Sequence, residues 1–538
     1  MVCRKPNQLI SMPPTTAADA LHQKQSGSTI SQVVVEMRKI GDISIPVMVV
    51  SFITYLKNMT LVMFMGQLGS LELAGGALAI GFTNITGYSV LSGLSMGMEP
   101  LCSQAFGSNN HSLLRATLRR TILMLLATSI PISFLWLNIK PLLLLLHQDP
   151  EIVETAAMFC RFAAPDLAAL SLLHPLRICL RCKGVTWPLM WCNSLSLLLH
   201  FPITYALTFT LQLGLHGLAV STFVADFITL FSLIIYLSIN ANKLPNQKGE
   251  GEEEEEEEEE AAPLYKPLIT PSRSRAAAEL TVAALISFDK DWIALLKFSI
   301  PSCLGVCLEW WWYELMTLLA GYLRNPRVTL ATCGILIQTT SLLYTLPNAL
   351  SSAASTRVGT ELGAGNPGRA RLASAVATTL SAVASILGLM WTTLGREMWA
   401  RLFTDDPEIL ELTMTVLPLI GLCELANCPQ TTGCGVLRGC GRPGVGAGIN
   451  LVAFYVVGGP VALGLGFVMG LGLMGLCCGL LAAQVCCFIG MLAVLGRTDW
   501  EMQSAVAREL VGLDMGADCG IIAIDLFKDV EQGAHVCT

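Results

Sequence analysis

Apolar runs of roughly 20 residues recur along the whole chain, and each is long enough to cross the hydrocarbon core of a bilayer. The sequence predicts about twelve such spans. They lie near residues 43–65, 76–98, 119–139, 156–178, 189–211, 216–239, 294–320, 328–350, 373–395, 411–436, 446–468 and 471–495. Only 14% of the 538 residues are charged, against about 25% in a soluble protein. Helices satisfy their own backbone groups in lipid, so the expected fold class is an all-α polytopic membrane protein.

The first half of the sequence returns in the second half at one spacing. Four short matches lie 257 residues apart: Asp149–Ile152 with Asp406–Ile409, Leu180–Arg181 with Leu437–Arg438, Asn109 with Asn366, and Asn193 with Asn450. Four matches at one spacing indicate an internal duplication. Because each half holds six spans, both halves insert the same way up. The sequence therefore predicts two six-helix lobes related by a pseudo-two-fold axis along the membrane normal, with a substrate path between them.

Composition divides the chain into five regions. Polar tails at 1–40 and 497–538 flank an N-lobe at 41–240 and a C-lobe at 292–496, and residues 241–291 link the lobes. The linker contains nine consecutive glutamates, Glu252–Glu260, and such a run of like charges stays solvated and disordered. The first forty residues lack an apolar segment, so no cleavable signal peptide is expected. The chain has no basic stripe, which argues against nucleic acid as a partner.

Positive charge in the short loops predicts the orientation. Eleven Lys and Arg residues follow the spans numbered 2, 4, 8 and 10: Arg115, Arg119, Arg120, Arg177, Arg181, Lys183, Arg357, Arg369, Arg371, Arg438 and Arg442. Six lie in or beside the opposite loops: Lys140, Arg161, Arg324, Arg327, Arg396 and Arg401. Both termini and the acidic linker are therefore expected to face the cytosol. Plasma membrane, vacuole, Golgi and late endosome all fit this pattern.

The nineteen cysteines are scattered through apolar segments, where free thiols act as small packing residues. Disulfide frameworks belong instead to small secreted domains. No His/Cys spacing indicates a zinc site, and no other metal or cofactor is expected.

The most informative acidic residue is Glu309, near the centre of the apolar stretch Pro301–Gly321. A carboxylate at membrane depth is costly and is by default a functional candidate. Desolvation favours its neutral form, so such a group can take up a proton on one side and release it on the other. The alternative is a structural hydrogen bond. Glu314 lies five residues further on, about 140° around the helix, and is a second candidate.

Other polar and aromatic side chains are candidates for the wall of a cavity. Tyr313 shares a helix face with Glu309, and Trp310 to Trp312 form either part of this wall or an interfacial aromatic belt. Glu424 lies mid-span with Asn427 one turn later, just before Pro429, which frees a backbone carbonyl. Both are candidates for a functional polar site beside a helix break, and the alternative is a polar contact between packed helices. The remaining cavity candidates are Gln338, Tyr55 and Lys57. Lys57 attracts anionic solutes, has a buried partner, or snorkels.

Four motifs give the chain a resemblance to the multidrug and toxic compound extrusion (MATE) family, in particular to its plant DETOXIFICATION-type members. They are G-M-E-P-L-C-S-Q-A-F-G at 97–107, P-S-C-L-G-V-C-L-E-W-W-W-Y-E at 301–314, S-A-A-S-T-R-V-G-T-E-L-G-A-G-N-P at 352–367, and G-V-L-R-G-C-G at 435–441. The resemblance implies a V-shaped cleft between two six-helix lobes. It also implies alternating access and export of small organic solutes in exchange for H⁺, with Na⁺ less favoured. Glu309 and Glu314 fall on the two acids of the family's E-W-W motif.

The chain departs from the family pattern at three positions. Asn427 stands where relatives usually carry an acid, so Glu424 takes over its role or Glu309 works alone. Thr329 stands near a further family Glu. Leu61 aligns with the first-helix Asp of bacterial members, which places coupling in the C-lobe.

The function expected from these observations is proton-driven antiport of xenobiotics, secondary metabolites or hormones. A lipid-linked-substrate flippase would need a strongly cationic cleft, for which the sequence offers mainly Lys57. A membrane enzyme would need paired Asp motifs or a His/metal cluster, and the sequence has neither. A scaffold that recruits partners through Glu252–Glu260 is the third alternative.

Overall fold

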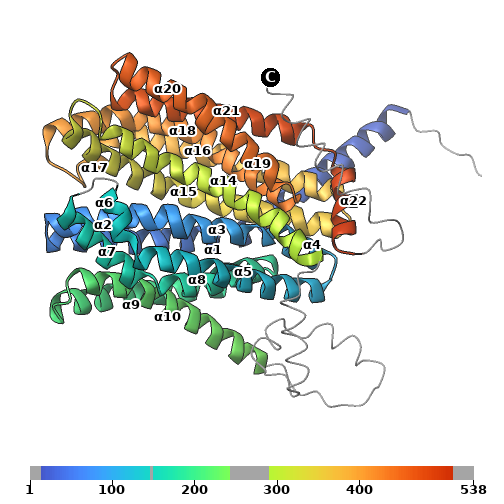
Figure 1. Ribbon diagram of the computed structural model, residues 1–538. Helices are drawn as coiled ribbons and strands as arrows, with labels where there is room; N and C mark the ends of the chain where they lie inside the picture. The colour runs from blue at the N-terminus through green and yellow to red at the C-terminus, as the bar shows by residue number, and fades with distance from the viewer. Residues whose placement is uncertain (1–13, 146–148, 243–289, 513–538) are drawn as a thin grey trace, which may run out of the picture.

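The computed structural model describes residues 14–145, 149–242 and 290–512, and every regular element in these ranges is a helix (Figure 1). In the first half these are α1 Pro14–Leu68, α2 Ser70–Thr83, η1 Asn84–Tyr88, α3 Ser89–Met96, α4 Met98–Gly107, α5 His111–Leu137, α6 Ile139–Leu145, α7 Pro150–Ala163, α8 Asp166–Cys182, α9 Trp187–Tyr205, η2 Ala206–Thr210 and α10 Leu215–Asn242. In the second half they are α14 Lys290–Ala320, α15 Pro326–Gly363, α16 Pro367–Leu394, α17 Arg396–Ala400, α18 Pro407–Gly439, α19 Pro443–Asn450, η3 Leu451–Gly458, α20 Gly459–Leu463, η4 Gly464–Val468, α21 Leu473–Gly496 and α22 Trp500–Leu510. The predicted all-α fold class is confirmed. The glutamate run lies outside the described residues.

Among the described residues, ten helices are long and apolar enough to cross a membrane, and α7 with α8 adds an eleventh span if the pair is counted as one. These two helices meet at a 50° bend, where Pro165 has no backbone N–H to continue the hydrogen-bond ladder. The span predicted at 189–211 corresponds to α9 and η2. Asn193, His200 and Pro202 make this segment less apolar, and it falls outside that set.

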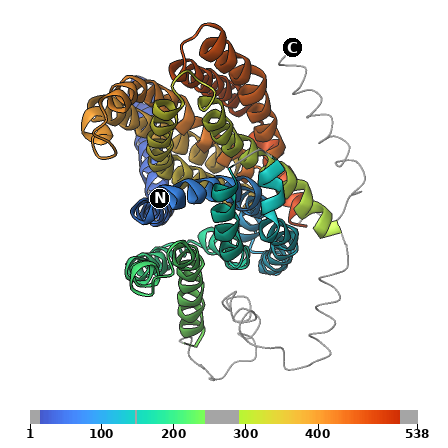
Figure 2. The ribbon, with the colours of Figure 1, turned by 60° about the vertical axis from the view of Figure 1, so that its left-hand side comes forward.

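The helices form two groups that lie side by side, coloured blue to green for the N-lobe and yellow to red for the C-lobe (Figure 2). Each lobe has its own apolar core, in which Trp136 is fully buried on one side and Phe454 on the other. The three most extensive contacts between the lobes are those of α1 with α15, α3 with α14, and α4 with α15. The interface between the lobes therefore lies mainly along these helices.

Helix caps reproduce the sequence repeat. The Asp149 side chain accepts a hydrogen bond from the backbone N–H of Glu151 at 2.9 Å and caps α7. At the repeat position, Asp406 accepts from the N–H of Glu408 at 3.0 Å and caps α18. In both cases proline occupies the first turn, where its missing N–H costs nothing. The two lobes therefore begin equivalent helices in the same way.

One of the four sequence matches is displaced by one residue. Asn366 is the N-cap residue of α16, and the residue that caps α5 is Asn110 rather than Asn109. Asn109 has φ 59°, and Gly365 occupies the equivalent left-handed position with φ 73°. Asn and Gly are the residues that tolerate this conformation, so the two turns correspond although the letters align one position off.

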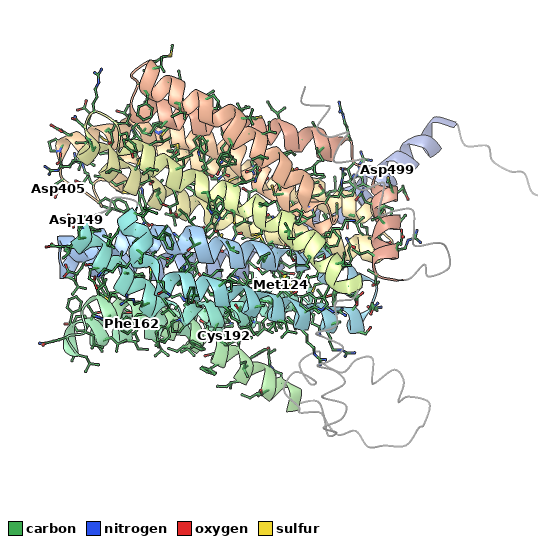
Figure 3. All side chains as sticks on the ribbon, viewed as in Figure 1. Met124, Asp149, Phe162, Cys192, Asp405 and Asp499 are labelled. Atoms are coloured by element: carbon green, nitrogen blue, oxygen red, sulfur yellow. The ribbon has the colours of Figure 1, made fainter. Side chains whose placement is uncertain are left out.

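The two lobes are oriented the same way up. Asp149 before α7 and Asp405 before α18 lie at one end of the molecule, whereas Asp499 before α22 lies at the other (Figure 3). This arrangement is the parallel repeat expected from six spans per half.

The packed structure extends beyond both ends of the predicted spans. α1 begins at Pro14 and α14 at Lys290, so Pro46 and Pro301 lie inside their helices instead of opening them. Beyond the last span, the amphipathic helix α22 packs on α4, α15 and α16. It therefore bridges the two lobes at the end of the molecule that carries α4.

Candidate functional site

A cavity of about 530 Å³ lies between the lobes. Its N-lobe wall comes from α1, η1, α3, α4, α8 and α9, and its C-lobe wall from α14, α15, α18 and α19. Pro46 of α1 lines the cavity from the N-lobe, and Pro301 of α14 lines it from the C-lobe. A volume of this size suits a drug-sized organic molecule.

Six of the nine residues predicted from the sequence line this cavity: Glu309, Glu314, Trp310, Tyr313, Asn427 and Tyr55. Three do not: Glu424, Lys57 and Gln338. Gln338 lies in α15, where Ile337, Ser341 and Tyr344 form the cavity face. One residue turns a helix by about 100°, which carries the Gln338 side chain off that face.

Glu309 lies on the cavity wall and is 8% exposed. Among the described residues, no side chain donates a hydrogen bond to its carboxylate or forms an ion pair with it. Arg438 is the cation that acts on it electrostatically, and the rings of Tyr313 and Tyr344 lie close by. A buried carboxylate without a direct partner is costly when ionised, so this position favours binding of a proton or a cationic group.

Glu314 points towards the opposite lobe. It interacts with Asn84 of η1, and a methyl group added at Gly81 would lie 3.2 Å from its Oε2 atom. The five-residue spacing therefore gives the two acids different neighbours although both line the cavity.

The three consecutive tryptophans of α14 enter three environments. Trp310 lines the cavity. Trp311 is 40% exposed, and its indole N–H donates to the Ile85 carbonyl of the N-lobe at 3.2 Å. Trp312 is 1% exposed and packs on Phe454 in the C-lobe core. Only one tryptophan of the motif is thus available to a solute in the cavity.

Glu424 and Asn427 act as a pair. The Asn427 amide donates to both carboxylate oxygens of Glu424, at 3.3 and 3.1 Å, and Cys428 Sγ contacts the second oxygen at 3.8 Å. Asn427 faces the cavity, whereas Glu424 lies behind it and is 2% exposed. A carboxylate therefore lies one turn before position 427, one hydrogen bond away from the cavity surface.

Lys57 has a buried partner that the sequence analysis missed. Its Nζ atom lies 2.8 Å from Oδ1 of Asp226 in α10. Asp226 is the single carboxylate in the apolar span 216–239, and that isolation was the available signal. The pair neutralises Lys57, so this lysine does not supply a cationic surface to the cavity.

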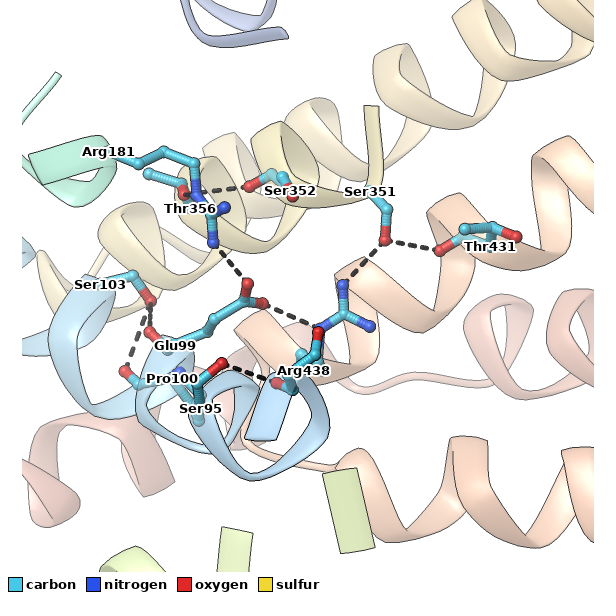
Figure 4. A network of polar contacts seen from close by, with 11 residues as sticks. Ser95, Glu99, Pro100, Ser103, Arg181, Ser351, Ser352, Thr356, Thr431 and Arg438 are labelled. Atoms are coloured by element: carbon cyan, nitrogen blue, oxygen red, sulfur yellow. Dashed lines mark hydrogen bonds and ion pairs between the residues drawn. The ribbon is translucent and has the colours of Figure 1, made fainter. Parts of the chain in front are cut away.

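A second constellation that the sequence did not indicate lines the cavity at its α4 end. Glu99 of α4 accepts hydrogen bonds from Arg181 of α8 on one oxygen and from Nε of Arg438 of α18 on the other, the latter at 2.8 Å (Figure 4). Arg181 also donates to Thr356 at 3.3 Å, and Arg438 to Ser351 at 2.9 Å. We call Glu99, Arg181 and Arg438 the latch, because they join the two lobes.

The latch uses the sequence repeat. Arg181 and Arg438 are equivalent positions of the duplication, yet both reach the same carboxylate. The residue 257 positions after Glu99 is Thr356, which offers a hydroxyl where its counterpart offers a charge. The two-fold relation is thus broken so that one acid holds a cation from each lobe.

Close backbone packing surrounds the latch. The Gln104 side-chain amide donates to the Gly439 carbonyl across the lobe boundary at 2.9 Å. A methyl group at Gly363 would lie 2.1 Å from the Gln104 carbonyl oxygen, and one at Gly107 would lie 2.0 Å from that of Thr360. Only glycine allows α4 and α15 to approach this closely. The motif glycines at 107 and 363 are therefore explained by closure of this end.

Several cations counted above as loop charges are buried in ion pairs. Arg181 and Arg438 belong to the latch, and Arg357 binds Glu36 of α1 at 2.7 Å together with Glu361. Arg120 binds Asp291 at 2.6 Å. These residues hold helix ends together.

Two bundles of membrane-spanning helices around a central cavity, joined at one end by ion pairs, define a polytopic membrane carrier. The sequence-family model MatE matches residues 46–206 and 301–464, one stretch in each lobe. The chain belongs to the MATE family of transporters.

Similar proteins agree with this membership over nearly the whole chain. Protein DETOXIFICATION 55 of Arabidopsis thaliana is 55% identical over 490 residues, which cover 91% of this chain and 94% of that protein. Protein DETOXIFICATION 48 of the same plant is 47% identical over 489 residues, which cover 91% of this chain and 86% of that protein. The crystal structure of the eukaryotic MATE transporter AtDTX14 superposes with a TM-score of 0.77 at 29% identity, covering 89% of this chain and 100% of that one. The predicted two-lobe MATE fold is confirmed.

The family is one of transporters and not of enzymes, as expected from the sequence. Within the described residues, no group of three or more His, Cys, Asp or Glu side chains is arranged to hold a metal ion. The chain is a multi-pass integral membrane protein.

Proposed function

We propose that this chain is a proton-coupled antiporter that exports organic solutes by alternating access. The observation that carries the proposal is the position of Glu309, a buried carboxylate on the cavity wall with no direct partner among the described residues. A proton that binds there removes the charge which a solute in the same cavity meets. Proton and solute therefore alter each other's binding, which is the requirement for exchange.

Arg438 connects this carboxylate to the closed end of the molecule. It acts electrostatically on Glu309 and binds Glu99 at 2.8 Å. A change in the charge of Glu309 changes the electrostatic environment of Arg438, and so the balance between the closed latch and an open one. Ligands shift such an equilibrium only through different affinities for its two states, and the latch supplies that difference.

We infer that the latch end faces the cytosol, following the excess of Lys and Arg there, and that H⁺ rather than Na⁺ is the coupling ion. The Glu424–Asn427 pair is the second proton-coupling group in this proposal, because Asn427 both lines the cavity and donates a hydrogen bond to the Glu424 carboxylate behind it. The exported solutes are xenobiotics, secondary metabolites or hormones. A flippase is disfavoured because Lys57 is neutralised by Asp226 and the C-lobe wall carries two acids.

Transport into proteoliposomes under an imposed pH gradient tests the proposal. Labelled organic cations and anions are offered to the wild type, to Glu309→Gln, and to Glu411→Gln as a matched control on the exposed surface of α18. Gradient-driven exchange should disappear in Glu309→Gln and persist in Glu411→Gln. Undiminished exchange by a correctly inserted Glu309→Gln protein would overturn the assignment of Glu309.

A further inference from the structure

The two walls of the cavity carry opposite chemistry. The C-lobe wall contributes the carboxylates of Glu309 and Glu314. The N-lobe wall contributes one acid, Glu99, and both of its oxygens are bound by arginines of the latch. A solute in the cavity therefore meets free carboxylates on one side only.

Arg177 is the cation that the N-lobe wall offers. It lies in α8, one turn before Arg181, and lines the cavity. One of its terminal nitrogens donates to Oδ1 of Asn193 at 3.3 Å, while its Nε atom is buried and has no hydrogen-bond partner. A guanidinium presents five N–H donors in a planar fork. The terminal N–H groups that do not bind Asn193 are the donors that Arg177 can offer to a ligand in the cavity.

The two carboxylates that act electrostatically on Arg177, Asp226 and Asp166, do not line the cavity, and Asp226 is already paired with Lys57. Asp226 is bound by Lys57 at 2.8 Å, and Asp166 is 2% exposed. Within the described residues, no Asp or Glu forms an ion pair with Arg177.

Two further donors lie on the same wall. The hydroxyl of Tyr55 in α1 is buried without a hydrogen-bond partner, and the residue lines the cavity. The imidazole of His174 also lines it, one turn before Arg177 on α8. Buried polar groups normally have partners, so the buried Tyr55 hydroxyl and the buried Arg177 Nε–H, which lack acceptors within the described residues, show that this wall is poor in hydrogen-bond acceptors.

We propose that this wall is a subsite for an oxyanion of the transported solute, with Arg177 as the binding group, His174 one turn away and Tyr55 on the same wall. A planar carboxylate fits a guanidinium in two parallel hydrogen bonds. The substrate class is then organic carboxylates, including amphoteric solutes whose basic end faces Glu309. The inference rests on the proposed function in one respect, namely that this cavity carries the exported solute.

Equilibrium binding to the full-length protein in detergent tests the subsite with a matched pair of probes, 2-naphthoate and 2-naphthamide. The two share shape and ring but differ in charge. The wild type should bind the carboxylate about tenfold or more tightly than the amide, because hydrogen bonds to a charged group contribute that much. Arg177→Gln should lose this preference, Arg177→Lys should keep part of it, and Arg369→Gln, at an exposed arginine of α16, should keep all of it.

The outcomes separate this inference from the proposed function. Equal affinity of the wild type for both probes, or no binding of 2-naphthoate at millimolar concentration, overturns the subsite even if Arg177→Gln fails to fold. An unchanged preference in folded Arg177→Gln overturns it as well. Glu309→Gln should retain the preference, because its side chain lies on the other wall. Intact gradient-driven exchange in Glu309→Gln would refute the coupling role while leaving the carboxylate preference standing.

Discussion

Consecutive residues of one helix have separate tasks in this molecule. Along α14, Trp310 faces the cavity, Trp311 reaches the other lobe, and Trp312 fills the C-lobe core. A rotation of about 100° per residue produces this division, so identical side chains in one motif have different physical roles.

Replacement of Trp312 by alanine should lower the free energy of unfolding by about 3–5 kcal/mol, because a large buried ring leaves a cavity behind. Trp310→Ala is the matched control and should cost much less stability while weakening solute binding. Thermal unfolding of the purified proteins measures the difference. Equal destabilisation by the two variants would contradict the environments described.

The Glu424–Asn427 pair provides a test by pH. Asn427→Asp places a second carboxylate about 3 Å from the first, and like charges so close repel when both are ionised. That repulsion is present at high pH and is relieved at low pH, when one acid is protonated. The melting temperature of Asn427→Asp should therefore fall below that of the wild type as pH rises from 5 to 8. Asn427→Ala only removes a donor to the Glu424 carboxylate, which also favours the ionised form, so its deficit should grow less with pH than that of Asn427→Asp.

The sequence predicts a candidate residue where an ionisable side chain lies near the middle of an apolar span. Glu309 is conspicuous because it interrupts an apolar run, and the structure has it on the cavity wall. Arg177 was read as a loop charge, because its position inside α8 and its turn towards the cavity depend on packing. Asp226 was missed for a similar reason, since its partner Lys57 lies 169 positions away in the chain.

At the scale of elements, the latch brings together the contacts that the proposed alternating-access mechanism would have to break. α4 packs on α15 through glycines, and Glu99 binds arginines from α8 and α18. α22 lies over the same end and touches α4, α15 and α16. Opening of this end therefore requires the loss of ion pairs and a shift of a tail helix.

Glu99→Gln should loosen this end, because breaking a buried ion pair leaves uncompensated charge and costs about 3–5 kcal/mol. Hydrogen–deuterium exchange in residues 98–107 and 351–363 should rise by at least about tenfold, the equivalent of 1.4 kcal/mol. Glu501→Gln, at an exposed glutamate of α22, serves as the control and should leave both segments protected. Unchanged protection in Glu99→Gln would show that the latch does not hold the lobes together.

At the scale of the whole molecule, the fold was the most predictable part. Hydropathy identifies the segments that span the membrane. The internal repeat indicates two halves inserted the same way up. The spans and the lobes could therefore both be predicted from the sequence. Helix ends were less predictable. α1 begins at Pro14 and α22 extends past the last span, because these segments are fixed by contacts such as Glu36 with Arg357 that hydropathy does not register.

The acidic linker provides a test of the scaffold alternative. Deletion of Glu252–Glu260 should leave solute flux in proteoliposomes unchanged, because a run of like charges between the two repeats of the sequence is expected to stay solvated and to add no packing. An equal-length Gly/Ser replacement controls for the shortened connection. Loss of flux in both variants would assign the run a part in transport.

The most direct test of the central claim measures protons and solute together. Wild-type proteoliposomes are loaded with a solute that the protein transports and contain a pH-sensitive dye, and the solute is then diluted outside. Exit of solute should acidify the interior in proportion to the flux, and Glu309→Gln should abolish this acidification. Solute flux through the wild type without any proton movement would contradict proton-coupled antiport.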